Sequence, residues 1–303
     1  MSPKLRTYSM PIALAVGSLF HKVFAGLDVL SPYIIASMLF VTFTRVRIGE
    51  LRLQKVHIGQ LVFQLVGGVG LYLLLKWCGV NEIVCQGVMI CAFIPTAMAS
   101  VVVGGMMGGS VTTMTTFMLL SHMAMALVAP VVFSLMGSGT TLPFLTSFWL
   151  VLRKLLLLVV APFVAAQLLG VVTPKGFEWV QKHQSLSFYL WLSSLVIIIA
   201  STTEYILAQP IENLHLEVAM ALLSGVLCLG QFALGKWWGR RFGDEVAGAQ
   251  SVGQKNTLLA VLLAQTYLHP LSSVAPTAYI IWQNLYNSRQ LARHSKQSER
   301  AEK

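Results

Sequence analysis

A polar segment at residues 250–256, which reads Gln-Ser-Val-Gly-Gln-Lys-Asn, interrupts a largely apolar stretch that extends from residue 244 to residue 268. Its lysine, Lys255, has about ten residues of mostly apolar chain on either side, which would place it near the middle of a lipid bilayer. An ionisable side chain at that depth is costly and indicates a function by default. Two roles are open to Lys255: its ammonium can tie opened backbone carbonyls together, or it can take part in charge coupling or anion binding.

A comparable interruption lies in the first half of the chain, in the apolar stretch at 82–109. It begins at 95–100, Pro-Thr-Ala-Met-Ala-Ser, and continues into paired glycines. A broken helix at membrane depth is tolerated only where the freed backbone faces protein or a wet cavity, and in secondary transporters such breaks form the substrate and ion site. The residues expected to form a substrate site at the two breaks are Pro95, Thr96, Ser100, Gly104, Gly105, Gln250, Ser251, Gln254 and Asn256.

The composition indicates an all-α integral membrane protein, because 56% of the residues are hydrophobic, 11% are charged and the mean hydropathy is +0.72. The net charge is +10, but the basic residues form short clusters between apolar spans. They lack the interleaved aromatic residues of a nucleic-acid surface, so the expected partners are the lipid bilayer and a small solute, not nucleic acid. No catalytic constellation, metal-binding cysteine spacing or cofactor motif is present, so neither an enzyme nor a bound cofactor is expected.

A helix needs about 20 apolar residues to cross roughly 30 Å of hydrocarbon. On that measure about ten spans are predicted, and each interruption falls in the fourth span of its half. This indicates two inverted repeats of five helices, at 1–136 and 144–290, followed by a tail at 291–303 with no apolar face wide enough to pack. The predicted spans are 8–25, 29–44, 56–76, 82–106, 110–136, 146–172, 186–207, 214–235, 244–267 and 270–288.

Lysine and arginine residues are concentrated in alternate connections between these spans, for example at Arg47, Lys175 and Arg240. The opposite connections, for example around Asn81 and Thr140, are nearly free of them. The positive-inside rule therefore places the basic connections in the cytoplasm. With an even number of spans, both termini and the tail are expected to be cytoplasmic, in a multi-pass protein of the inner (plasma) membrane.

Other polar residues within the spans are candidates for ion coupling or for structure. Gln64, in the third span, and Gln231, its counterpart in the eighth, can each reach a break or can bond one helix to another. His122 is expected to be a buried histidine with satisfied hydrogen bonds more than a proton relay. Arg153 and Lys154 either attract an anionic substrate or extend their side chains to the membrane surface.

The interruption at 250–256 and two later segments resemble the bile acid:sodium symporter family. The three similar segments are Ser251-Val252-Gly253-Gln254-Lys255-Asn256, His269-Pro270-Leu271 and Trp282-Gln283-Asn284. The similarity extends over essentially the whole chain. It implies ten helices in two inverted five-helix repeats, with helices 4 and 9 unwound and crossing. It also implies a panel domain of helices 1, 2, 6 and 7, a core domain of helices 3–5 and 8–10, and transport of bile acids or other organic anions with sodium.

The resemblance also implies where sodium ligands would lie. At the second crossover the family reads Glu-Val-Gly-Met-Gln-Asn, which puts its acidic sodium ligand on Ser251 and its glutamine ligand on Lys255. At the first, Thr-Ala-Ser-Asn-Val falls on residues 98–102, so that the serine remains as Ser100. Gln64 matches a glutamine of the second sodium site.

The hydroxyl ligands of the following helix fall on Met114 and Met118, and a slip of one residue would place them on Thr113 or Thr115. The implied ion-coupling residues are thus Gln64, Ser100, Thr113, Thr115, Ser251 and Lys255. Sodium requires hard oxygen ligands with compensating negative charge, which methionine does not supply and a lysine opposes. The exchanges therefore weaken the expectation of sodium coupling.

The expected function is a secondary active transporter of organic anions or small carboxylates, bile-acid-like or other, that works by alternating access. One alternative is a sodium-independent carrier, proton-linked or facilitative, in which Lys255 takes the place of an ion. Another alternative, from a different class, is a membrane receptor or sensor that keeps the fold without transport.

Overall fold

The structure, a computed structural model, describes residues 12–46, 48–136, 144–183 and 185–301. Within these ranges every regular element is a helix, and the only bridge between extended segments is a single antiparallel pair. Six helical segments of the described chain are long and apolar enough to cross a membrane: His21–Phe43, Lys55–Trp77, Val111–Met136, Phe144–Val172, Ser185–Leu207 and Ile211–Arg240. The prediction of an all-α, multi-pass membrane protein is confirmed at this level.

The first half of the chain contains the interruption predicted near residue 95. Residues 12–19 are also helical. The elements that follow are α2 (His21–Phe24), η1 (Ala25–Leu30), α3 (Ser31–Phe43), η2 (Ile48–Glu50), α4 (Lys55–Trp77), α5 (Glu82–Phe93), α6 (Ala99–Met106) and α7 (Val111–Met136).

The second half contains the interruption predicted near residue 254. Its elements are α8 (Phe144–Leu155), the π-helical turn η3 (Leu156–Val160), α9 (Ala161–Val172), α10 (Pro174–Lys182), α11 (Ser185–Leu207), η4 (Ile211–Asn213), α12 (Leu214–Arg240), α13 (Glu245–Gly253), α14 (Thr257–Tyr267), η5 (Pro270–Ser273) and α15 (Val274–Ala301).

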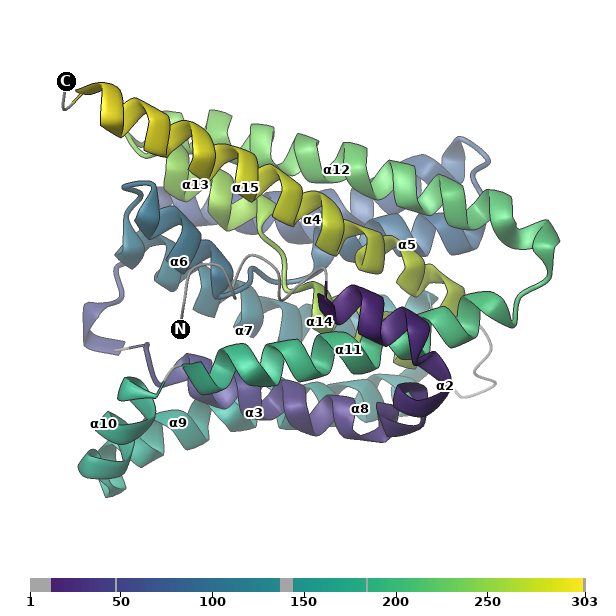
Figure 1. The fold of residues 1–303 in the computed structure, drawn as a ribbon, viewed down its shortest axis with the longest axis horizontal. Helices are drawn as coiled ribbons and strands as arrows, with labels where there is room; N and C mark the ends of the chain where they lie inside the picture. Colours follow the sequence, from purple (N-terminus) through teal and green to yellow (C-terminus); the bar gives the residue numbers. More distant parts are fainter. Residues whose placement is uncertain (1–11, 47, 137–143, 184, 302–303) are drawn as a thin grey trace.

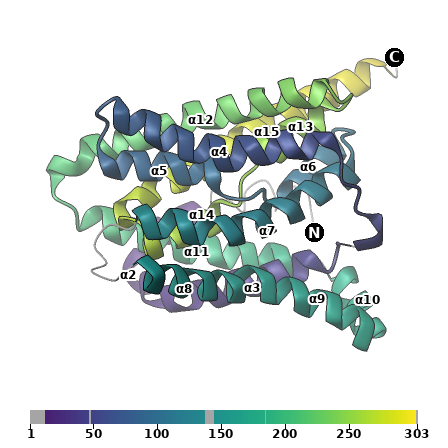
Figure 2. The same cartoon turned by 180° about the vertical axis from the view of Figure 1, so that it is seen from behind.

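The helices form two layers that run along the long axis of the molecule (Figures 1 and 2). One layer contains α2, α3, α8, α9 and α11, and the other contains α4, α5, α12, α13 and α15, with α7 and α14 between them. A continuous apolar core joins the layers, with Ile35 and Phe43 from α3, Phe93 from α5 and Leu259 from α14 among its fully buried members. The interrupted helices therefore lie inside the protein.

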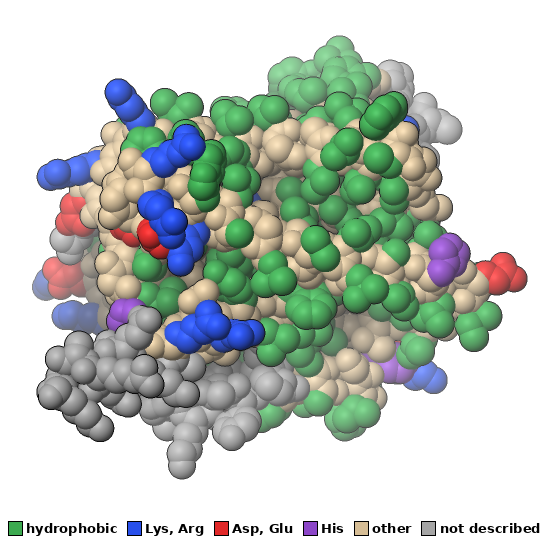
Figure 3. Space-filling view, turned by 90° about the horizontal axis from the view of Figure 1, so that it is seen from above, with side chains coloured by type: hydrophobic (Ala, Val, Ile, Leu, Met, Phe, Trp, Pro, Cys, Tyr) green, Lys and Arg blue, Asp and Glu red, His purple; other side chains and the backbone are tan. Residues whose placement is uncertain are grey.

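Lysine and arginine side chains gather at one end of the molecule, where α12 ends, whereas apolar side chains cover the flank of the face seen in Figure 3. At this end Glu245 is paired with Arg240 at 2.6 Å and with Lys236 at 3.3 Å. A basic end beside an apolar flank is typical of the cytoplasmic side of a membrane protein, and the assignment of sides stays a prediction.

Two local features of the structure add to what the sequence indicates. The tail beyond residue 288 continues α15 as helix to Ala301, because it is rich in Arg, Gln, Lys, Glu and Ala and contains neither Gly nor Pro. Gly104 and Gly105 lie inside α6. The chain reverses after them, at Gly108, whose φ of 81° is the left-handed conformation that favours glycine.

Candidate functional site

The first interruption separates α5 from α6 and has a local cause. Proline has no N–H and disfavours helical geometry in the residue before it, and Ile94 is accordingly extended, with φ −62° and ψ 149°. The helix resumes at Ala99. The intervening residues 94–98 cross the interior of the protein without an intrahelical partner for every backbone group.

The second interruption separates α13 from α14. Gln254, just after the end of α13 at Gly253, is extended with φ −87° and ψ 98°. The side chain of Asn256 then caps α14 by accepting a hydrogen bond from the N–H of Leu259 at 3.4 Å. All residues from Gln250 to Thr257 are buried.

The two interruptions lie against each other. Thr96 and Lys255 form an antiparallel bridge, in which the N–H of Ala97 donates to the carbonyl of Gln254 at 3.0 Å and the N–H of Asn256 donates to the carbonyl of Pro95 at 2.9 Å. Each break therefore satisfies backbone groups of the other, as buried polar backbone requires. Segments about 160 residues apart in sequence meet at one point, which we call the crossing (residues 94–98 and 253–257).

The ammonium of Lys255 lies at the crossing and is 1% exposed. Its Nζ donates to the carbonyl oxygen of Ala92 at 2.9 Å and to that of Ile94 at 3.3 Å. Both carbonyls are at the end of α5, where they have lost their helical partners and where the helix dipole is negative. Lys255 therefore caps α5 from the opposite break, which is the first of the two roles that the sequence left open.

A polar stripe on α15 supports the second break. The hydroxyl of Tyr279 donates to the carbonyl of Gly253 at 2.9 Å, and the side-chain carbonyl of Gln283 accepts from the N–H of Lys255 at 3.0 Å. Asn287, one turn further, accepts from the amide of Gln250 at 2.8 Å and donates to the side-chain oxygen of Gln254. Sequence reasoning missed Tyr279 and Asn287 as site residues, although their spacing of four with Gln283 was visible as one helix face.

Side chains of α4 and α7 hold the first break. Gln64 donates to the carbonyl of Phe93 at 3.0 Å, and the hydroxyl of Ser121 accepts from the N–H of Thr96 at 3.2 Å. Thr96 in turn donates its hydroxyl to the carbonyl of Ser251 at 2.5 Å. The structure thus brings Gln64, Thr96 and Ser251 together at the crossing.

His122 of α7 also reaches the crossing. Its Nδ1 lies 2.8 Å from the carbonyl of Met118 and so carries the proton, which leaves Nε2 to accept from the side-chain amide of Asn256 at 3.5 Å. Its ring meets that of Phe43 on α3 edge to face, with ring centroids 5.6 Å apart. The hydrogen bonds of His122 are satisfied, as expected, and its position joins the crossing to the other helix layer.

Several buried polar atoms around the crossing have no hydrogen-bond partner among the described residues. They are the hydroxyls of Ser100 and Ser251, the side-chain oxygens of Gln64 and Gln250, and both amide atoms of Gln60. A buried polar group without a partner costs roughly 1–3 kcal/mol, so such groups are either bound by a ligand or water or carry a functional constraint. Two of them, Ser100 and Ser251, were predicted as site residues.

The donor set at the crossing does not fit a sodium ion. None of the described side chains that form hydrogen bonds there is a carboxylate, and the ammonium of Lys255 already binds the freed carbonyls of Ala92 and Ile94. A sodium ion beside it would be repelled at short range in a buried setting.

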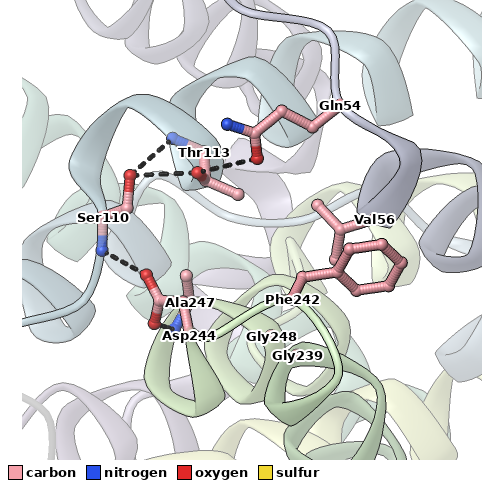
Figure 4. A pocket seen from close by; sticks show the side chains of 9 residues that line it. All are labelled: Gln54, Val56, Ser110, Thr113, Gly239, Phe242, Asp244, Ala247 and Gly248. Carbon is pink, nitrogen blue, oxygen red and sulfur yellow. Dashed lines mark hydrogen bonds between the residues drawn. The ribbon is translucent and has the colours of Figure 1, made fainter.

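A separate cavity of about 220 Å³ lies at the basic end of the molecule (Figure 4). Asp244 bridges it, since its Oδ2 accepts from the N–H of Ser110 and its Oδ1 from that of Ala247, each at 2.7 Å. The cavity is lined by Gln54, Val56, Ser110, Thr113, Gly239, Phe242, Asp244, Ala247 and Gly248.

The threonines on which a slip of one residue would place the hydroxyl ligands, Thr113 and Thr115, do not lie at the crossing with the other predicted site residues. Thr113 donates its hydroxyl to Ser110 at 2.9 Å and faces the cavity, not the crossing. Thr115 is half-buried, and no hydrogen bond between described residues connects it to the crossing. Gly104 serves packing, because a Cβ there would overlap the sulfur of Met114 in α7, and Gly105 is half-buried beside it.

Comparison with known proteins assigns the chain to no family, because no protein-family model and no curated protein matches it.

Proposed function

We propose that the chain is a secondary active transporter of organic anions or small carboxylates, bile-acid-like or other, that works by alternating access. The observation that carries this proposal is the ammonium of Lys255, 1% exposed and bonded to two freed carbonyls where two interrupted helices cross. Interrupted helices that cross in the interior of a membrane protein are the usual framework of a transport site.

The arrangement of helices supports the finer organisation expected from the sequence. Counted with their interruptions, α4, α5–α6 and α7 precede the middle of the chain, and α12, α13–α14 and α15 repeat that order after it. This order is compatible with ten spans in two inverted five-helix repeats. The layer that contains α2, α3, α8, α9 and α11 (Figure 1) would be the panel domain, and the helices that carry the crossing would be the core domain.

We further propose that transport does not depend on sodium. The negative end of α5 is compensated by the ammonium of Lys255, so no metal ion is needed to hold its freed carbonyls. Transport is then either coupled to protons, which keeps it secondary active, or uncoupled, which makes the chain a facilitative carrier. Both place Lys255 at the centre of the mechanism, either as a proton carrier or as a permanent counter-charge for an anion.

The proposed setting is the inner (plasma) membrane, with the basic end and both termini in the cytoplasm. Cysteine substitutions at Arg47 and Asn81, made in a Cys78→Ser background because Cys78 is exposed, and labelled in intact cells with an impermeant reagent, test the orientation. Asn81 is expected to react from outside and Arg47 only after lysis, and equal labelling of both from outside would contradict the proposed sides.

Uptake by purified protein in sealed proteoliposomes tests the transport proposal. Labelled cholate, lactate and succinate are offered with imposed pH gradients, and protein-free liposomes set the background. The wild-type protein is expected to take up at least one of these anions above background. Lys255→Gln is expected to lose uptake or to change its pH dependence, whereas the surface variant Lys182→Gln retains both. Binding of these anions without flux would refute transport and favour a receptor.

A further inference from the structure

A second cation, Lys154 of α8, lies away from the crossing and at membrane depth. It is ten residues, or about 15 Å of helix, from the start of the apolar segment Phe144–Val172. Its side chain is exposed, and none of the ion pairs between described residues involves it. A lysine at this depth with no acidic partner requires a reason.

The ammonium of Lys154 lies where α8 meets the helices that carry the crossing, a boundary that we call the seam. Its Nζ lies 5.7 Å from the centroid of the Tyr267 ring, within the range of a cation–π contact. Tyr267 is the last residue of α14 and stacks on Phe133 of α7, with ring centroids 5.6 Å apart and planes 14° apart. Because α14 starts at the crossing, the Tyr267 ring lies at the seam about 15 Å from the crossing, on the proposed outer side.

The neighbouring residue, Arg153, lies on a different face of α8. On the helical wheel it shares a face with Trp149 and Leu157, which are 59% and 61% exposed on the apolar flank. Lys154 instead borders the buried face of α8, one residue before Leu155, which is fully buried. Arg153 is therefore directed to lipid, from which it can reach the membrane surface, and Lys154 is directed to the seam.

We propose that Lys154 is the outer binding contact for the carboxylate of the substrate, an inference that rests on the transport function proposed above. The ring of Tyr267 holds the ammonium without neutralising it, so its charge stays available to an anion that enters between the two helix layers. In this partly desolvated setting the attraction for a carboxylate exceeds that in water. Lys154 therefore selects organic anions over neutral and cationic solutes before they reach the crossing.

Uptake kinetics in proteoliposomes test this role with a matched pair of neighbouring charges. Lys154→Gln is expected to raise KM for the best of cholate, lactate and succinate at least about tenfold, with little change in the maximal rate, because a ground-state contact is lost. Lys154→Arg is expected to restore a KM near that of the wild type. Arg153→Gln, which removes the same charge one residue away, is expected to change KM less than about twofold.

Two kinetic results would overturn the assignment. One is a KM within twofold of the wild type for Lys154→Gln, and the other is an equal rise in KM for Arg153→Gln. Equilibrium binding of the same labelled anions in detergent separates this inference from the transport proposal. Binding without flux, weakened about tenfold in Lys154→Gln, would refute transport and leave the contact standing. Absence of both binding and flux for all three anions in the wild-type protein would overturn both.

Discussion

The two interruptions at the crossing look alike in the backbone but are held in place by different chemistry. The first is caused by Pro95 and is supported by side chains from separate segments, among them Gln64 and Lys255. The second contains no proline and is supported mainly by one helix, α15, through Tyr279 and Gln283. A local rule therefore breaks the first helix, whereas the second break depends on tertiary partners.

The difference teaches that the halves of the molecule are not equivalent at the point where they meet. Lys255 of the second break places its ammonium at the first break, whereas no described residue of the first break places a charged group at the second. Backbone hydrogen bonds run in both directions across the bridge between Thr96 and Lys255. The crossing is therefore one unit with a single positive centre, and four predictions test how much each of its contacts contributes to stability.

The largest effect is expected from Lys255→Met, which keeps the length of the side chain but removes the ammonium. The carbonyls of Ala92 and Ile94 then lose their buried donor, at a cost of roughly 1–3 kcal/mol for each unsatisfied group. We expect a loss of about 3 kcal/mol in the free energy of unfolding. Chemical denaturation in detergent measures it, with Lys182→Met as the exposed control; equal stability of the two variants would contradict the capping role.

The second break should be weakened by Tyr279→Phe, which removes only the hydroxyl that donates to Gly253. A buried carbonyl left without its donor gives an expected loss of about 1.5 kcal/mol. Tyr286→Phe is the matched control, because Tyr286 stacks on Phe232 through its ring. If both variants lose the same stability in chemical denaturation, the support from α15 does not act through this hydroxyl.

The bridge between the breaks should respond to Thr96→Val, a change of nearly equal volume that removes the hydrogen bond to the carbonyl of Ser251. The expected loss is about 1 kcal/mol. Hydrogen exchange at the amides of Ala97 and Asn256 should also accelerate, since these amides form the bridge. Thr112→Val, at an exposed position of α7, serves as the control, and unchanged exchange at both amides would show that the bridge does not need Thr96.

The smallest effect concerns the two glutamines that the sequence treats as counterparts. Gln64 donates to Phe93 at 3.0 Å, whereas Gln231 donates to Cys91 at 3.4 Å. Interhelical hydrogen bonds in membranes average about 0.6 kcal/mol. We therefore expect Gln64→Leu to cost about that much, and Gln231→Leu a few tenths of a kcal/mol less. Both bonds end on α5, so the reverse order in unfolding measurements would mean that Gln231, despite its longer bond, is the stronger support of this helix.

Much of the fold followed from local sequence signals. Proline at position 95 predicts the end of α5, and the polar run after Val252 predicts the end of α13. The apolar spans predict the helices that cross the membrane. The tail lacks an apolar face wide enough to pack, yet it is helical to Ala301, because its residues are good helix formers.

The candidate site was less predictable, because its partners come together only in the folded chain. Sequence placed Lys255 in the interior but could not identify Ala92 and Ile94 as its acceptors, since they lie about 160 residues earlier. Alignment by resemblance put the hydroxyl ligands on Met114 and Met118, with Thr113 or Thr115 reached by a slip of one residue, yet Thr113 faces the cavity bridged by Asp244. A shift along one helix changes which face a residue occupies, and spacing alone does not fix that choice.

The sodium dependence of uptake tests the central claim most directly, namely that the ammonium of Lys255 does the work of a bound cation. The measurement is the initial rate of anion uptake by wild-type proteoliposomes as external sodium is replaced by N-methylglucamine at constant ionic strength. We predict rates that agree within about twofold across the series, because the freed carbonyls at the crossing are already compensated. A steep rise of the rate with sodium would contradict the claim and would require a sodium site that the crossing, as described here, does not provide.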